Sequence, residues 1–214
     1  MFLRWTFLAA LSLASAAAAE TRLVDAVKAG DLTQAQNLLR AGADANASDG
    51  EGTPALHWAT HSGNEAMVDA LLAAKANPNA PSRYKITPLN LAAANGNAAI
   101  IEKLLAAGAD PNATSEEGQT PLMTAALNGR IDVVRALLRH GVQVNSAEQF
   151  KGQTALMFAA GEGNTAAVEL LLEFGADLKA KSKAGYTPLL FAVRNNRLDT
   201  VSFLLQKEIG RAHV

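Results

Sequence analysis

The sequence predicts an all-α solenoid made of short helix-turn-helix units that stack on one another. Three observations lead to this prediction. Leucines recur at a nearly constant interval, a glycine or asparagine follows each of them seven residues later, and a leucine pair follows after that. The recurring leucines are Leu23, Leu56, Leu89, Leu122, Leu156 and Leu189, at intervals of 33, 33, 33, 34 and 33 residues. A fixed period of this length is the signature of a repeat architecture.

The stretch from Thr87 to Asn112 shows most clearly how one unit is built. Thr87 can cap a first helix with its hydroxyl, and Pro88 suits the first helical position. We expect Gly96 to end this helix and Gly108 to end a second one, since glycine readily takes the left-handed conformation. A helix of about two turns is not stable alone in water, so each unit requires neighbours.

The 33-residue period and the T-P-L opening at Thr87, Thr120 and Thr187 resemble the ankyrin repeat. The resemblance covers residues 20–207 and implies an ankyrin-repeat solenoid with β-hairpin-type loops and an incomplete last unit. It predicts six units, with approximate boundaries at residues 20–51, 52–84, 85–117, 118–151, 152–184 and 185–207.

Residues 1–19 have the features of a signal peptide. Arg4 gives a positive start, residues 7–13 are apolar, and residues 17–19 are three alanines before Glu20. The alternative is an uncleaved membrane anchor, although the apolar stretch is shorter than the roughly 20 residues of a membrane span. We therefore expect a protein that starts at Glu20 after cleavage, is periplasmic or secreted, and has no membrane association.

Several units depart from the regular pattern. The first lacks the T-P opening and carries extra charges, as terminal repeats do where one face meets water. Lys75 replaces the glycine that should end a second helix, so we expect a strained or longer helix end there. Lys85 replaces a hairpin glycine. One extra residue lies around Glu148 to Lys151, which accounts for the single 34-residue interval.

Residues 208–214 do not continue the repeat. The pattern requires glycine at position 208, where the chain has Glu208. Residues 209–214 can be encoded by a string that resembles a widely used short-read sequencing adapter. We interpret the segment as non-native read-through. The alternative is a natural tail with this sequence by chance.

Composition narrows the classes of partner. Apolar residues make up 49% of the chain and aromatic residues only 5%, so the interior must be packed by aliphatic side chains. The 19 basic and 20 acidic residues nearly balance, which argues against a nucleic-acid partner held by charge. The chain has no cysteine, so disulfides and thiolate zinc sites are excluded.

The sequence contains no recognisable catalytic or cofactor-binding motif. His57 and His61 have a spacing that can bind a metal, but His57 occupies the position where the ankyrin family uses a structural histidine between loops. We predict no catalytic residue, no cofactor and no metal. The repeated Asp44, Asp110 and Asp177 are interpreted as turn formers.

The residues that vary between units are the candidates for partner binding. In the ankyrin family, partners lie across the hairpin tips and the exposed side of the first helices. Carried over by position, the candidate residues are Glu51, His61, Arg83, Tyr84, Ile86, Asn95, Glu116, Glu117, Gln119, Asn128, Phe150, Lys151, Gln153, Glu162, Lys183, Tyr186, Arg194 and Asn195. We expect Tyr84, Phe150 and Tyr186 to lie along one edge as interface anchors, unless they pack on a neighbouring hairpin.

The resemblance therefore implies an exported, monomeric protein–protein interaction module or scaffold with no catalytic activity of its own. Its partner would be a protein of mixed charge. The alternative is a recognition arm of a longer enzyme, or a secreted effector, whose C-terminal part is missing from this sequence.

Overall fold

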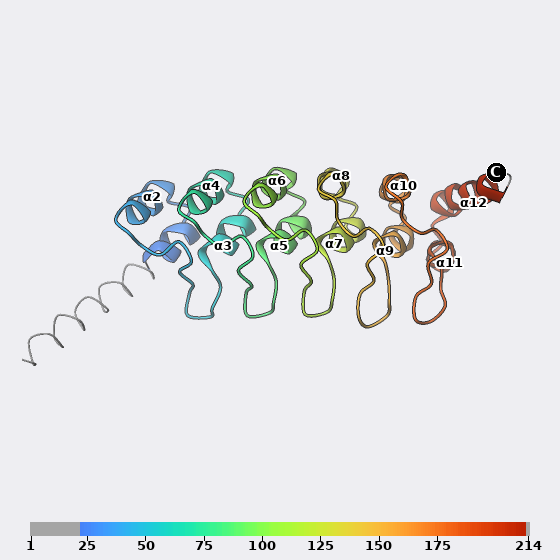
Figure 1. The fold of residues 1–214 in the computed structure, drawn as a ribbon, viewed down its shortest axis with the longest axis horizontal. Helices are drawn as coiled ribbons and strands as arrows, with labels where there is room; N and C mark the ends of the chain where they lie inside the picture. The colour runs from blue at the N-terminus through green and yellow to red at the C-terminus, as the bar shows by residue number, and fades with distance from the viewer. Residues whose placement is uncertain (1–21, 213–214) are drawn as a thin grey trace, which may run out of the picture. The chain divides into compact units, whose positions relative to one another are not determined.

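The structure of the protein is a computed structural model that describes residues 22–212 (Figure 1). The predicted signal peptide, residues 1–19, lies outside the described residues. The chain forms two compact structural units, each larger than a single repeat. The first ends at Pro88 and the second begins at Leu89, and from here on 'unit' refers to these two. Within the described residues every regular element is an α-helix, and the hairpins contribute only isolated β-bridges. The predicted all-α class is confirmed.

From residue 22 onward, the first unit contains the helix over residues 22–28, α2 (Leu32–Arg40), α3 (Ala55–His61) and α4 (Glu65–Ala73). α4 packs against both α2 and α3. Short polar residues begin two of these helices, because the Asp31 carboxylate accepts from the Gln34 N–H and the Asn64 side chain from the Met67 N–H. The core between the helices is formed by the buried side chains of Leu23, Leu56, Met67 and Leu71.

The second unit contains the remaining helices, which are α5 (Pro88–Asn95, beginning at the division), α6 (Ala98–Ala106), α7 (Pro121–Leu127), α8 (Ile131–Arg139), α9 (Ala155–Glu162), α10 (Thr165–Glu173), α11 (Pro188–Arg194) and α12 (Leu198–Ala212). α9 packs on α7, α10 and α11, and α8 packs on α6, α7 and α10. In this unit α6, α8 and α10 form one layer and α5, α7, α9 and α11 the other, with the hairpins beyond it (Figure 1).

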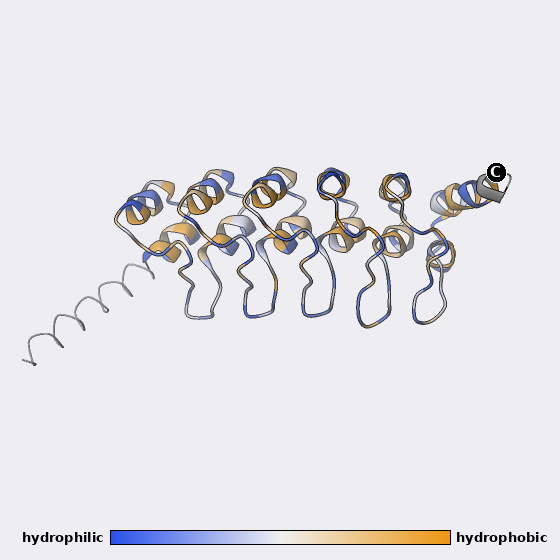
Figure 2. Cartoon of the chain, viewed as in Figure 1, coloured by the Kyte–Doolittle hydropathy of each residue, from blue (hydrophilic) through white to orange (hydrophobic). Residues whose placement is uncertain are grey.

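Hydropathy follows this layering within each unit. Figure 2 shows hydrophobic colour concentrated on the helices and mostly hydrophilic or neutral colour on the hairpin loops. The repeated leucines contribute to the hydrophobic character of the helices. In the second unit Leu89, Leu122 and Leu156 are buried, whereas Leu189 is only half-buried. The apolar period thus marks the faces on which helices pack.

The residues seven positions after each repeated leucine have the backbone conformation predicted for them. All six have positive φ, namely Gly30, Gly63, Gly96, Gly129, Gly163 and Asn196, with values from 56° to 78°. At Gly96 an added Cβ would lie 2.7 Å from the Arg130 Cδ, so the flexible Arg130 side chain would have to move. The positive φ is therefore the main reason for glycine there.

The expectation of a strained or longer helix end at Lys75 is confirmed in its first form. Lys75 takes φ 69°, so a lysine does occupy the strained left-handed conformation. The helix is not longer, however, because α4 has nine residues, as do α6, α8 and α10. In the following turn the Asn77 N–H donates to the Asn46 side chain at 2.7 Å. Lys85, in a hairpin, has φ 56°.

The repeated aspartates are turn formers, as predicted. The carboxylates of Asp44, Asp110 and Asp177 each accept from the backbone N–H two residues later, at 2.8–2.9 Å. Asparagines then connect successive turns in the second unit. Asn112 accepts from the Gln143 N–H at 2.8 Å, and Asn145 from the Asp177 N–H at 2.7 Å.

The last helix differs from the other second helices of its unit. α12 has 15 residues instead of nine and continues past Glu208, which stands where α6 and α8 have their closing glycine. Glutamate and isoleucine have no preference for the left-handed conformation, and no turn of the Asn77 kind follows them in the described residues.

Candidate functional site

The predicted partner-binding residues are mostly on the surface of their units. In the first unit Glu51, His61, Arg83 and Tyr84 are exposed, whereas Ile86 is half-buried. In the second unit Gln119 and Gln153 are half-buried, and the exposed ones are Asn95, Glu116, Glu117, Asn128, Phe150, Lys151, Glu162, Lys183, Tyr186, Arg194 and Asn195. The expectation of one aromatic edge stays a prediction for Tyr84, because Phe150 and Tyr186 belong to the other unit.

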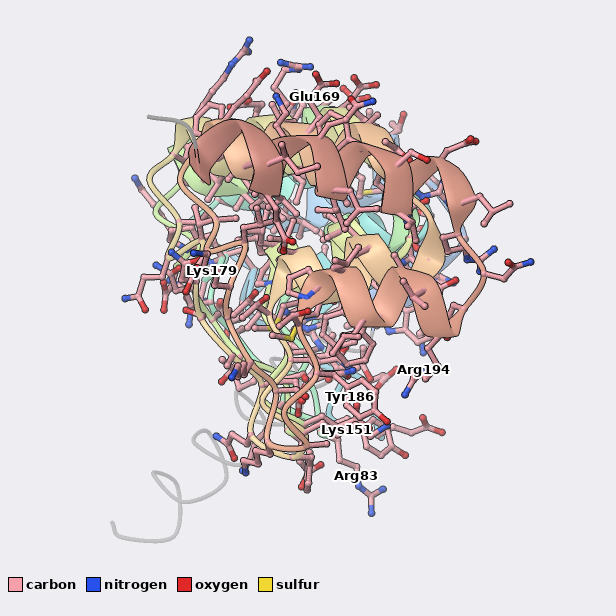
Figure 3. All side chains as sticks on the ribbon, turned by 90° about the vertical axis from the view of Figure 1, so that its right-hand side faces the viewer. Arg83, Lys151, Glu169, Lys179, Tyr186 and Arg194 are labelled. Carbon is pink, nitrogen blue, oxygen red and sulfur yellow. The ribbon has the colours of Figure 1, made fainter. Side chains whose placement is uncertain are left out.

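Six of the predicted residues meet at one cleft in the second unit. It has a volume of about 440 Å³ and lies between the 148–153 hairpin, the 182–187 hairpin and α11. Its lining consists of Phe150, Lys151, Gln153, Ser182, Lys183, Ala184, Tyr186, Phe191 and Arg194. Figure 3 shows Lys151, Tyr186 and Arg194 gathered beside α11, with Lys179 and Glu169 on other sides of the molecule. This set of residues is called the aromatic cleft.

The 148–153 hairpin is built around a buried carboxylate. Glu148 is 6% exposed, and its oxygens accept from the N–H groups of Phe150, Lys151 and Gln153 at 2.6–3.0 Å. Burial raises the pKa of Glu148, but these N–H donors and the charge of Lys183 outweigh it, so the pKa is below its ordinary value. The long glutamate side chain spans the one extra residue of this hairpin.

The neighbouring hairpin has the shorter form. The Ser182 N–H donates to the Tyr186 carbonyl at 3.0 Å, and the Tyr186 N–H donates back to the Ser182 hydroxyl at 3.1 Å. In the longer hairpin, the Glu148 N–H instead reaches the Gln153 carbonyl, one residue further along. The two hairpins are joined where the Lys183 N–H donates to the Lys151 carbonyl at 2.8 Å. The extra residue therefore projects Phe150 outward beside Tyr186.

The apolar wall of the cleft is a pair of aromatic rings in contact, with their planes tilted by 50°. The rings of Tyr186 and Phe191 have centroids 5.8 Å apart, and the Arg194 guanidinium lies 5.0 Å from the Phe191 centroid and 5.5 Å from that of Tyr186. Phe150 is 68% exposed and Tyr186 37%. Arginine stacked on aromatic rings is typical of interface anchors. Phe191 was not predicted as a site residue, since its position lies in the middle of a first helix.

Two other predicted residues participate in contacts within the second unit. The Asn195 amide donates to the Gly161 carbonyl at 2.8 Å, and Glu162 pairs with Arg197 at 3.3 Å. Both interactions connect the end of α9 to the turn between α11 and α12. These two side chains are exposed but already have partners, so they contribute to packing as well as to the surface.

The first unit has a polar cluster that the sequence did not indicate. Lys28 Nζ lies 2.8 Å from an Asp49 oxygen and 4.4 Å from the centroid of the Trp58 ring, and the Trp58 indole N–H donates to Asp49 at 3.1 Å. The bond from Lys28 is the largest cause that lowers the pKa of Asp49 to about 2. His61 meets Trp58 edge-on, with centroids 6.4 Å apart. These residues are off the 33-residue period, so only their side-chain reach brings them together.

His57 has the structural role expected for it. It is 3% exposed, and its Nε2 lies 2.8 Å from the Ile86 carbonyl, which makes this nitrogen the donor. Burial lowers the pKa of His57, so the ring is neutral at physiological pH. Among the described residues, no group of three or more His, Asp or Glu side chains is arranged to hold a metal ion.

Comparison with protein families gives one match. The family model for ankyrin repeats (3 copies) matches residues 23–115, 87–148 and 141–212. No curated protein matches the chain. Within residues 22–212 we also find no helix with the length and apolar character that crossing a membrane requires.

Proposed function

Because the chain belongs to the ankyrin repeat family, whose members are generally protein–protein interaction modules, we propose that it is an exported scaffold that binds a protein partner. Binding takes place at the hairpin tips and the exposed side of the first helices. The protein acts as a monomer and has no catalytic activity of its own.

One observation supports this proposal most directly, and it is the aromatic cleft. Phe150 and Tyr186 are large apolar side chains that remain exposed in a chain with few aromatics. Exposed aromatics beside a stacked arginine are enriched at interface hot spots, whereas surface residues of a purely structural repeat are mostly small or charged. Phe150 is off the 33-residue packing period and 68% exposed, so packing within the chain does not account for it, whereas the Tyr186 ring also contacts Phe191.

Export is supported by the sequence of residues 1–19 alone. A positive start, an apolar stretch and three alanines before Glu20 form a cleavable leader. N-terminal sequencing of the protein purified from its native cells should give Glu20 as the first residue. Mature protein that still begins at Met1 would contradict cleavage and favour a membrane anchor.

Site-specific photocrosslinking tests the binding surface. A photoreactive phenylalanine analogue replaces Phe150 in the cleft or, as a matched control, Phe174, which is 44% exposed at the end of α10. Crosslinking in the native cells should give one defined protein adduct from position 150 that is lost when Tyr186→Ala is added. Identical adducts from both positions, or none from position 150, would refute the cleft as the partner site.

A further inference from the structure

We propose that the aromatic cleft takes an acidic peptide segment of the partner protein. In this arrangement one or two carboxylates of the segment pair with Lys151 and Arg194, and an adjacent apolar side chain packs between Phe150 and Tyr186. This inference rests on the proposed function and adds the chemistry of the ligand to it.

The charges of the cleft favour an anion. Lys151, Lys183 and Arg194 line it, and no acidic side chain does. The nearest carboxylate, Glu148, is buried and already accepts backbone N–H groups. Lys183 is partly used, because its Nζ donates to the Gln149 carbonyl. Among residues 22–212, no carboxylate forms an ion pair with Lys151 or Arg194.

Arg194 is oriented to receive a carboxylate. Its guanidinium carbon lies over the rings of Phe191 and Tyr186, 5.0 and 5.5 Å from their centroids, and these contacts restrict its movement. One donor, Nε–H, points to the Asn195 side chain at 3.4 Å, and this leaves the terminal nitrogens for a ligand. A planar guanidinium with free terminal donors can bind a carboxylate through two parallel hydrogen bonds, and less orientational entropy is lost because stacking has already restricted it.

The apolar surface of the cleft favours a ligand that has an apolar side chain as well as carboxylates. Phe150 is 68% exposed at the tip of its hairpin, and Tyr186 forms the opposite side. A volume of about 440 Å³ can hold one or two side chains of a peptide. Burying an apolar side chain between two aromatic rings contributes affinity, while the flanking carboxylates set specificity and association rate.

A nucleic acid or another long polyanion fits this surface less well. Such ligands are held by many phosphate contacts along an extended basic track. The chain has 19 basic and 20 acidic residues, and exposed acids such as Glu116 and Glu117 belong to the same unit as the cleft. The cleft is lined by three cations together with three aromatic side chains. A short acidic segment matches this local arrangement.

The experiment is selection of random peptides displayed on phage against the intact chain, followed by affinity measurements on synthetic copies of the selected peptides. We expect enrichment of Asp and Glu next to a large apolar residue. Binding should weaken by about tenfold or more in the double variant Lys151→Gln/Arg194→Gln. The control Lys179→Gln/Arg139→Gln removes the same charge at exposed sites outside the cleft and should bind like the wild type.

A second variant separates charge from stacking. Arg194→Lys keeps the positive charge but loses the planar fork, so it should bind more weakly than wild type and more tightly than Arg194→Gln. Circular dichroism melts of each variant check folding. The side chains of Lys151 and Arg194 are both exposed, so the melting temperatures of their variants should match that of the wild type.

Four outcomes of the peptide experiment would overturn the inference. They are no peptide enrichment, selected peptides without acidic residues, equal binding to the Lys151→Gln/Arg194→Gln variant, and equally tight binding of an oligodeoxythymidylate that depends on the same two cations. A crosslink from position 150 to a partner segment without acidic residues would sink this inference and leave the proposed function intact. Selection of acidic peptides without any native crosslink would contradict the proposed partner site and leave this inference about the cleft's ligand intact.

Discussion

The interior helix pair α7–α8 and the last pair α11–α12 have matching residues in very different environments. Met123 is 1% exposed and its counterpart Leu190 is 45% exposed, while Leu138 and Leu205 are 4% and 41% exposed. Ala126 is fully buried, whereas Val193 is 53% exposed. The side chains are all apolar, so the difference comes from the neighbour that covers them. In a repeat protein, burial depends on both adjacent pairs.

This comparison also explains where the aromatic cleft can lie. α11 contributes Phe191 and Arg194 to the cleft and belongs to the less covered pair. Neighbouring helices do not cover α11 on every side, so some of its side chains are available to bind a partner. The interior pair has less freedom of this kind, because Met123, Ala125 and Ala126 are all buried.

The largest predicted effect is on stability at matched leucines. Leu138→Ala should lower the free energy of unfolding by roughly 2–4 kcal/mol, because it leaves a cavity between packed helices. Leu205→Ala should cost about 1 kcal/mol or less, since that side chain is already partly in water. Urea unfolding of both variants measures the difference. Equal losses would mean that the last pair is covered as fully as the interior one.

The hairpins before α9 and α11 should differ in how much stability each loses when its capping side chain is removed. Glu148→Ala should cost about 1–3 kcal/mol, because three backbone N–H groups lose their acceptor, whereas Ser182→Ala removes one and should cost about 1 kcal/mol. The folded pKa of Glu148 is lowered, so its charge stabilises the fold above the ordinary value of 4.5. That contribution is lost as pH falls below this value and through the folded pKa.

Unfolding measured from neutral pH down to about 3 checks the sign. The wild type should lose stability more steeply than Glu148→Gln over this window, because the amide cannot be protonated. A Glu148→Gln curve parallel to that of the wild type would show that the carboxylate is not the group responsible.

The smallest predicted effect concerns the helix ends. Lys75 has positive φ without the freedom of glycine, so Lys75→Gly should stabilise by about 1 kcal/mol. Gly141, at the same place after α8, has φ 71° and no atom near an added Cβ, so Gly141→Ala should destabilise by about the same amount through backbone strain alone. Thermal melts of the two variants should shift in opposite directions. Shifts of the same sign would contradict this explanation.

The repeat positions could be predicted from the sequence because each repeat has the same physical requirement. Leucine packs between neighbours, glycine takes positive φ, and aspartate closes a turn, so their spacing alone gave the all-α repeat fold. Lys75 departs from this pattern, because a lysine takes the positive φ that glycine takes after α6, α8 and α10.

The candidate site was only partly predictable. The sequence indicated that Phe150, Tyr186 and Arg194 are variable surface residues, but not that they share a cleft with Phe191. That arrangement depends on the Lys183 to Lys151 backbone bond between hairpins and on Glu148 spanning the extra residue. The Lys28, Asp49 and Trp58 cluster was missed for a similar reason, because it depends on side-chain reach.

The measurement that tests the central claim most directly is the affinity for the crosslinked partner, together with the melting temperature, of Phe150→Ala and Phe174→Ala. Both side chains are exposed aromatics of the second unit, and only Phe150 lines the cleft. We expect Phe150→Ala to lose about 2 kcal/mol or more of binding free energy with unchanged melting, while Phe174→Ala binds normally. Unchanged affinity in Phe150→Ala, or melting that falls in step with its binding, would contradict the account.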